Sequence, residues 1–142
     1  MSEVTLSQAR AIVAAAIEAA AGQGIAGASV VVVDLGGAIR AAERTDAAPP
    51  FGADIALAKA RTALGFRRST IKTAAVFGEK PAIVTGLNAA VLPAFLPLGG
   101  GVVLFDGEGA AIGAAGLAGG MPEKDHESIA AGAAAAGLST GD

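Results

Sequence analysis

Two short apolar runs, each followed by a glycine-containing turn and a second run, are the feature that most constrains this chain. Residues 28–34 (ASVVVVD) are β-branched and too short for a helix, and residues 38–44 follow after the turn L-G-G. Residues 101–105 and 110–117 flank the turn D-G-E-G, whose glycines supply the positive φ of a tight hairpin. We therefore predict two β-hairpins, which pair antiparallel and argue against a doubly wound parallel sheet.

Helical spacing of apolar residues predicts helices before, between and after the hairpins. The predicted helices are residues 6–22, 53–66, 69–77 and 122–136. Residues 81–97 have the weakest pattern, and we expect a short helical turn and a short strand there. The sum is an α+β fold in which two consecutive helices cross one face of the sheet.

Length and composition limit both the core and the classes of function. A chain of 142 residues fits one domain, residues 1–142. With 53% apolar but only 4% aromatic residues, we expect a core of small side chains and close backbone approach. The absence of Cys excludes disulfides and thiolate sites. A net charge of -3, without a basic run longer than two residues, argues against nucleic-acid partners.

A membrane location is also not expected. Residues 81–105 carry no charge, but three prolines and a run of glycines would interrupt a spanning helix and leave backbone groups that lipid cannot satisfy. The N-terminus (MSEVTLSQAR) lacks a basic region followed by an apolar stretch. We therefore expect a cytoplasmic protein.

Three segments in this order resemble the GlcG/HbpS family, which also supplies the C-terminal domain of PduO-type cobalamin proteins. They are residues 32–46 (VVDLGGAIRAAERTD), residues 54–66 (DIALAKARTALGF) and residues 99–133 (GGGVVLFDGEGAAIGAAGLAGGMPEKDHESIAAGA). One departure is Leu117-Ala118-Gly119, where the family usually has V-S-G, so a hydroxyl that would line a site is missing.

The resemblance implies a profilin-like three-layer α/β/α sandwich with a five-stranded antiparallel sheet, assembled into homo-oligomers such as tetramers or octamers. Members of the family include haem-binding and haem-degrading proteins, a glycolate-utilisation accessory protein and domains attached to cobalamin enzymes. The resemblance therefore implies more about fold than about function.

The chain's single histidine, His126, lies beside Asp125 where a glycine-rich run gives way to the last predicted helix. Gly119, Gly120 and Met121 precede this helix, whose unpaired N–H groups can bind a carboxylate or phosphate. Alternatively, the glycines form a tight turn and the acidic residues only complement the helix dipole. Because adjacent helix residues lie about 100° apart, Asp125 is the better candidate for an inward-facing role, and His126 is either catalytic or a surface residue.

Four further residues are candidates for ligand contacts. Lys59 emerges from an apolar stripe of its helix. It either extends to solvent or aims its charge at a ligand carboxylate, or at Asp34 or Asp46 across the sheet. The family resemblance favours a functional role for Lys59 and Thr62. Arg44 and Asp46 lie two apart at a strand end, where they pair with each other or Arg44 binds a ligand carboxylate.

Two functions from different classes follow from these residues. The first is a small oligomeric ligand-binding protein of the GlcG/HbpS type that holds haem or another tetrapyrrole. Haem iron needs a His, Met, Cys or Tyr donor, and a chain without Cys or Tyr leaves His126 or Met121 as axial ligand.

The second is a cofactor-independent tautomerase or isomerase acting on a small organic acid or diacid in a catabolic pathway. In it Arg44 or Lys59 orients a carboxylate, and His126 or Asp125 moves a proton. An accessory subunit without chemistry fits the sequence equally. We predict no separate metal site, because one histidine and scattered carboxylates lack ligand spacing.

Overall fold

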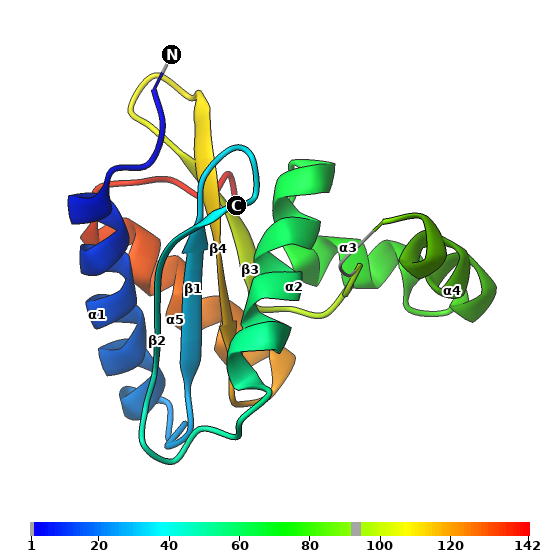
Figure 1. The fold of residues 1–142 in the computed structure, drawn as a ribbon, viewed down its shortest axis with the longest axis horizontal. Helices are drawn as coiled ribbons and strands as arrows, with labels where there is room; N and C mark the ends of the chain where they lie inside the picture. Colours follow the sequence, from blue (N-terminus) through cyan, green and yellow to red (C-terminus); the bar gives the residue numbers. More distant parts are fainter. Residues whose placement is uncertain (1, 92–94) are drawn as a thin grey trace.

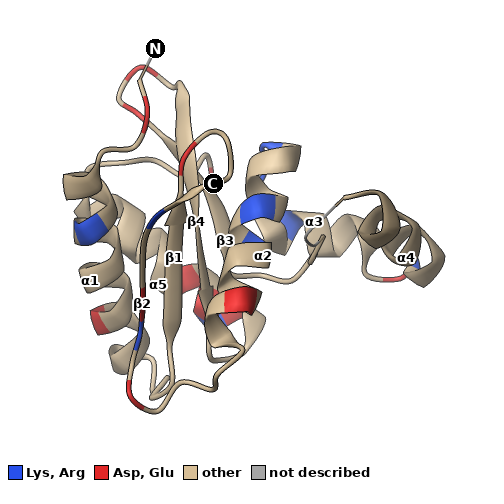
Figure 2. Ribbon diagram, in the orientation of Figure 1, with Lys and Arg blue, Asp and Glu red and all other residues tan. Residues whose placement is uncertain are grey.

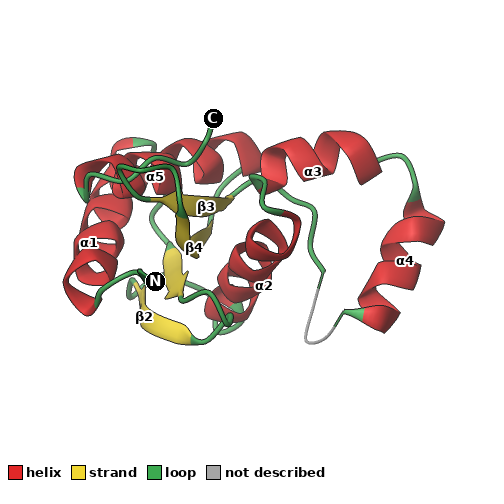
Figure 3. Cartoon of the chain, turned by 90° about the horizontal axis from the view of Figure 1, so that it is seen from above, coloured by secondary structure: helices red, strands yellow, loops and turns green. Residues whose placement is uncertain are grey.

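The computed structural model describes residues 2–91 and 95–142. It is an α+β protein in which helices cover both faces of a four-stranded sheet (Figures 1 and 3). The strands are β1 (Ser29–Val33), β2 (Ile39–Arg44), β3 (Gly101–Phe105) and β4 (Ala111–Ala118). The helices are α1 (Leu6–Gly22), α2 (Gly52–Phe66), α3 (Thr70–Phe77), α4 (Pro81–Ala90) and α5 (Pro122–Ala135).

Both predicted hairpins are confirmed. β1 pairs antiparallel with β2, and β3 pairs antiparallel with β4. β1 also pairs antiparallel with β4, which joins the hairpins into one sheet of order β2-β1-β4-β3. Among the described residues the sheet therefore has no parallel pair.

An aspartate organises each hairpin turn. Asp34 Oδ1 accepts hydrogen bonds from two backbone amides of its turn at 2.9 and 3.0 Å, and Asp106 Oδ1 accepts two at 2.9 Å. The turns also contain Gly37 and Gly109, with φ of 81° and 79°, a conformation that glycine adopts without steric cost. The same local chemistry thus closes both hairpins.

The two faces of the sheet are packed differently. On β1, Val30 and Val32 point into a cluster with α1 and α5, whereas Val31 and Val33 point toward α2. On β4, Ala114 and Ala118 also face α2. Larger side chains therefore fill the α1/α5 side, and mostly small ones separate the sheet from α2.

Glycines let the backbone of α2 approach the sheet closely. A Cβ at Gly116 would collide with the carbonyl oxygen of Ala56, and a Cβ at Gly101 would collide with that of Lys59. The close backbone approach expected from the small-residue composition is therefore present.

The expected five-stranded sheet is wrong, because the sheet has four strands in the part of the chain that the structure describes. The family resemblance suggested the larger sheet, and residues 81–97 were the segment expected to hold an extra short strand. Instead, residues 81–90 form the full helix α4, and residues 95–100 are irregular. Within the segment where this strand was expected, residues 92–94 lie outside the described residues.

The prediction that two consecutive helices cross one face of the sheet is also wrong. α2 packs across the sheet, but α3 continues beyond the β3 edge and leads to α4, so the two form an arm beside the sandwich (Figures 1 and 3). Within the described ranges, no helix combines the length and apolar character needed to cross a membrane.

Candidate functional site

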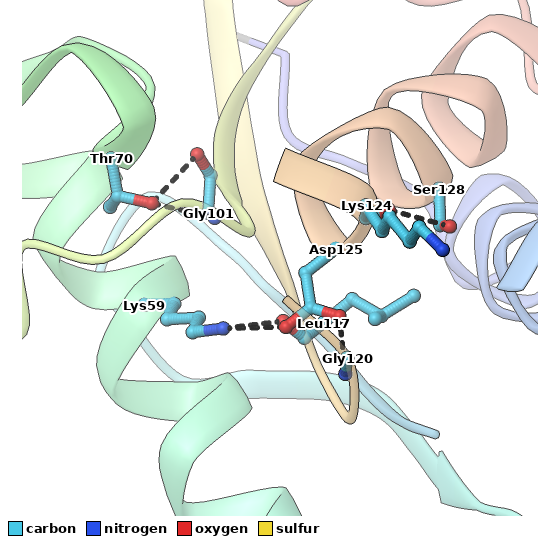
Figure 4. Close-up of polar contacts among 8 residues, drawn as sticks. All are labelled: Lys59, Thr70, Gly101, Leu117, Gly120, Lys124, Asp125 and Ser128. Atoms are coloured by element: carbon cyan, nitrogen blue, oxygen red, sulfur yellow. Dashed lines mark hydrogen bonds and ion pairs between the residues drawn. The ribbon is translucent and has the colours of Figure 1, made fainter. Parts of the chain in front are cut away.

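A buried ion pair connects α2 to the start of α5 (Figure 4). Lys59 Nζ lies 3.0 Å from Asp125 Oδ2, and the two side chains are only 4% and 1% exposed. Lys59 Nζ also donates to the carbonyl of Leu117 at 3.1 Å, and Asp125 Oδ1 accepts from the amide of Gly120 at 2.8 Å. Both carboxylate oxygens are therefore paired, and α2 is tied to the end of β4 and to the turn that follows it.

The local sequence explains why the pair is enclosed. The helical repeat places Lys59 on the same face of α2 as the buried residues Ala56 and Ala63. At Gly100, a Cβ would lie 2.9 Å from Lys59 Nζ and 3.0 Å from Asp125 Cβ, so no side chain fits beside the pair. Asp125 lies in the first turn of α5, where the helix dipole favours a negative charge. Lys59 therefore neither reaches solvent nor contacts Asp46.

A surface hollow of about 490 Å³ lies between the turn after α1 and the turn before α5. We call it the glycine hollow, and its lining residues are 23–27, Ala47, Pro49, 119–121 and Lys124. Met121 is 66% exposed there. Because Asp125 holds the amide of Gly120, the buried ion pair also fixes one wall of the hollow.

Gly119 and Gly120 pack against the opposite wall of this hollow. A Cβ at Gly119 would lie 2.5 Å from the carbonyl oxygen of Gly27, and a Cβ at Gly120 would lie 2.8 Å from the side chain of Ile25. These contacts favour the tight-turn interpretation of the two glycines. Beside them, Met121 and Lys124 are the larger side chains at the rim of the hollow.

His126 has different surroundings from its neighbour Asp125. Its Nε2 lies 3.6 Å from Asp142 Oδ2, and its side chain is 18% exposed. Its Nδ1 is buried and has no hydrogen-bond partner among the described residues. His126 is not among the residues that line the glycine hollow, so the structure does not bring it together with Met121 there.

The remaining predicted residues lie apart from the buried pair. Thr62 is 3% exposed, and its Oγ1 donates to the carbonyl of Ala58 at 2.7 Å and accepts from the amide of Leu96 at 2.8 Å. Arg44 is exposed and donates to the carbonyl of Ala48 at 3.4 Å. Asp46 is exposed as well, and no ion pair between Arg44 and Asp46 is found in the described part of the chain.

Sequence reasoning missed a second polar cluster, at the start of α3. Ser69 Oγ donates to Asp142 Oδ1 at 3.0 Å, and Lys72 Nζ lies 3.0 Å from the same oxygen. The three-residue spacing of Ser69 and Lys72 at a predicted helix start was a visible signal. Their shared partner Asp142, which lies 73 residues from Ser69, was not. No group of three or more potential metal-binding side chains occurs in residues 2–91 and 95–142.

Together these features define an α+β protein in which two β-hairpins share one antiparallel sheet with helices on both faces. Solved structures with a similar fold include the PduOC:heme complex, with 25% sequence identity, a TM-score of 0.85 and 99% of each chain covered. HbpS has 31% identity and a TM-score of 0.80, covering 94% of this chain and 90% of HbpS. The ORFY protein of Klebsiella pneumoniae has 28% identity and a TM-score of 0.83, covering 96% and 92%.

The family described as haem degrading protein HbpS-like matches residues 4–134. The chain therefore belongs to the HbpS-like family, which confirms the family predicted from its three motifs. No curated protein matches the chain significantly.

Proposed function

We propose that this protein binds haem or a related tetrapyrrole at the glycine hollow, with Met121 as the axial ligand of the iron. The observation that carries the proposal is the exposed Met121 side chain, 66% accessible at the rim of a hollow of about 490 Å³. Membership of the HbpS-like family and similarity to a protein solved as a heme complex support a haem ligand.

The choice of Met121 over His126 rests on accessibility. Thioether sulfur and imidazole nitrogen both ligate haem iron in proteins. The imidazole of His126 has one nitrogen buried and the other facing a carboxylate, so it offers no free nitrogen toward the hollow. Met121 already points into solvent and needs no rearrangement.

Other parts of the hollow suit a flat, partly apolar ligand with acidic side groups. The backbone at Gly24 is open to a ligand, because no other atom lies within 4 Å of the position that a Cβ would occupy there. Lys124 is exposed at the rim and supplies a positive charge for a propionate. The Lys59–Asp125 pair supports the hollow through Gly120 and is a positioning pair in this proposal.

A hemin titration of the full chain, followed at the Soret band, tests the proposal. We expect saturable one-to-one binding by the wild type and an affinity loss of about tenfold or more, with a changed axial-ligand spectrum, in Met121→Leu. His126→Ala should bind like the wild type. Ile39→Leu is a matched control, since Ile39 is an exposed apolar residue at the opposite end of the sheet from Ala118.

Weak, non-saturating hemin absorbance in the wild type would overturn the haem proposal. Loss of the axial-ligand signature in His126→Ala with retention in Met121→Leu would overturn the assignment of Met121 and restore His126 as the ligand.

The isomerase interpretation required charged groups that converge on one small cavity. Lys59 and Asp125 are enclosed and neutralise each other, and Arg44 lies at the exposed end of β2. The residues assigned to this function therefore do not converge on one cavity, and catalytic roles for His126, Asp125 and Lys59 stay predictions.

The arm formed by α3 and α4 supports the expected homo-oligomer. No residue of α4, which the structure describes throughout, is buried, and Val76, Ile83, Val91 and Leu98 expose 42–46% of their surface on or beside the arm. Apolar surface of this kind is commonly covered by a second copy in symmetric oligomers. Sedimentation velocity of the wild type and Ile83→Asp tests this, and a wild-type monomer would contradict it. The tetramer or octamer and the cytoplasmic location stay predictions.

A further inference from the structure

The start of α3 holds a carboxylate in a polar pocket separate from the glycine hollow. Ser69 Oγ and Lys72 Nζ each lie 3.0 Å from Asp142 Oδ1, and His126 Nε2 lies 3.6 Å from Asp142 Oδ2. Side chains from α3, from its N-cap position and from α5 therefore surround both oxygens of one carboxylate.

The pocket carries more positive charge than its one carboxylate neutralises. It has a volume of about 320 Å³ and is lined by residues 66–69, Lys72, Phe105 and residues 140–142. Arg67, Arg68 and Lys72 contribute three basic side chains, and Asp142 contributes the one acidic side chain of the lining. Figure 2 shows basic residues gathered where α2 ends and α3 begins. Such an excess attracts small anions.

Two residues of the pocket depart from what helix stability alone favours. Ser69 occupies the N-cap position of α3, yet its hydroxyl makes no capping hydrogen bond to the helix and is directed to Asp142 instead. Arg67 adopts φ 51° and ψ 41°, the left-handed conformation that usually selects glycine after a helix. Ser69 is 1% exposed, so its hydroxyl is a fixed, buried donor at the base of the pocket.

Asp142 can leave the pocket without unfolding the chain. The segment before it is held independently, because Phe105 N donates to Ser139 O at 2.8 Å and Ser139 N donates to Phe105 O at 3.0 Å. Displacing Asp142 breaks only its own side-chain contacts and keeps this bridge.

We propose that this pocket binds the carboxylate of a small organic acid, and that Asp142 occupies the position of that carboxylate in the absence of the acid. Ser69 and Lys72 bind one oxygen of the ligand, and His126 faces the other. The site is additional to the proposed haem site, since the two share no lining residue.

An NMR titration of the full chain with succinate at constant ionic strength, followed at the backbone amides of residues 69–72, tests the proposal. Asp142→Ala should bind succinate saturably and about tenfold more tightly than the wild type, because the intramolecular competitor is gone. In the Asp142→Ala background, Lys72→Met should weaken binding by about tenfold or more. Lys80→Met is the matched control, since it removes an exposed lysine outside the pocket.

The absence of a saturable shift in Asp142→Ala would overturn the proposal, and so would equal binding by Lys72→Met and Lys80→Met. A parallel titration with phosphate separates the two kinds of oxyanion, because saturation by phosphate but not by succinate would overturn the carboxylate assignment. None of these outcomes depends on hemin binding.

Discussion

Lys59 and Asp125 form a buried ion pair with 3.0 Å between Nζ and Oδ2, although 66 residues separate them along the chain. The pair joins α2, on one face of the sheet, to α5, on the other, around the ends of β3 and β4. The pair also holds one wall of the glycine hollow, through the amide of Gly120.

Breaking this pair on one side should destabilise the fold strongly. Asp125→Ala leaves a buried ammonium without its carboxylate, and we expect a loss of about 3–5 kcal/mol in the free energy of unfolding. Urea denaturation measures this. The double variant Lys59→Met/Asp125→Leu should lose less than Asp125→Ala, and exposed Glu123→Ala should change stability by at most about 1 kcal/mol. A double variant less stable than Asp125→Ala would contradict the explanation.

A methyl group at Gly116 should separate α2 from the sheet. Gly116→Ala forces the carbonyl of Ala56 to move, and we expect a cost of about 1–3 kcal/mol or more. Gly65→Ala is the matched control, because an added Cβ there meets nothing within 4 Å and should stabilise α2 by about 0.5–1 kcal/mol. Thermal unfolding of the two variants in parallel checks the opposite signs.

Thr62 should act through its hydrogen bonds and not through a ligand. Thr62→Val leaves the amide of Leu96 without its acceptor, at a cost of about 1–3 kcal/mol, and amide exchange at Leu96 should accelerate. Thr62→Ser keeps the hydroxyl and should retain most of the protection. Hemin affinity should be unchanged in both variants, and a selective loss of hemin binding in Thr62→Val would instead favour the ligand role predicted from the family resemblance.

Relieving the backbone conformation at Arg67 should stabilise the chain. Arg67→Gly removes a side chain from the left-handed region, and we expect a gain of about 1 kcal/mol. Arg68→Gly provides the comparison, because no positive φ exists at that position and glycine only adds freedom to the unfolded chain. If Arg67→Gly is the less stable of the two, the strain argument fails.

The sequence predicted the regular elements well where their signals are local. The bounds of α1 agree with the expected range, and α2, α3 and α5 begin and end within about a residue of it. The turns after residues 33 and 105 were predictable because their Asp side chains bond to backbone amides only two to four residues further on, and their glycines lie in the same turns. Helix α4 also had a local start signal, because Pro81 occupies its first turn. The signal was missed because the rest of the segment is apolar and contains two further prolines.

The error in strand number has a different origin. Five strands came from the family resemblance, whereas the sequence patterns outside residues 81–97 predicted the four strands that the described residues form. Residues 81–90 form helix α4 and not a strand, and this helix lies away from the sheet (Figure 1).

What the sequence by itself determined is therefore the set of helices and hairpins, the small-residue core and the short supply of haem-iron donors, because each depends on composition or on neighbours within a few residues. Only the tertiary structure decided that Lys59 pairs with Asp125, that His126 and Ser69 meet Asp142, and that Met121 stays exposed. These relationships join residues that are distant in the chain. They are set by how closely glycines allow α2, β4 and α5 to pack, which no local pattern specifies.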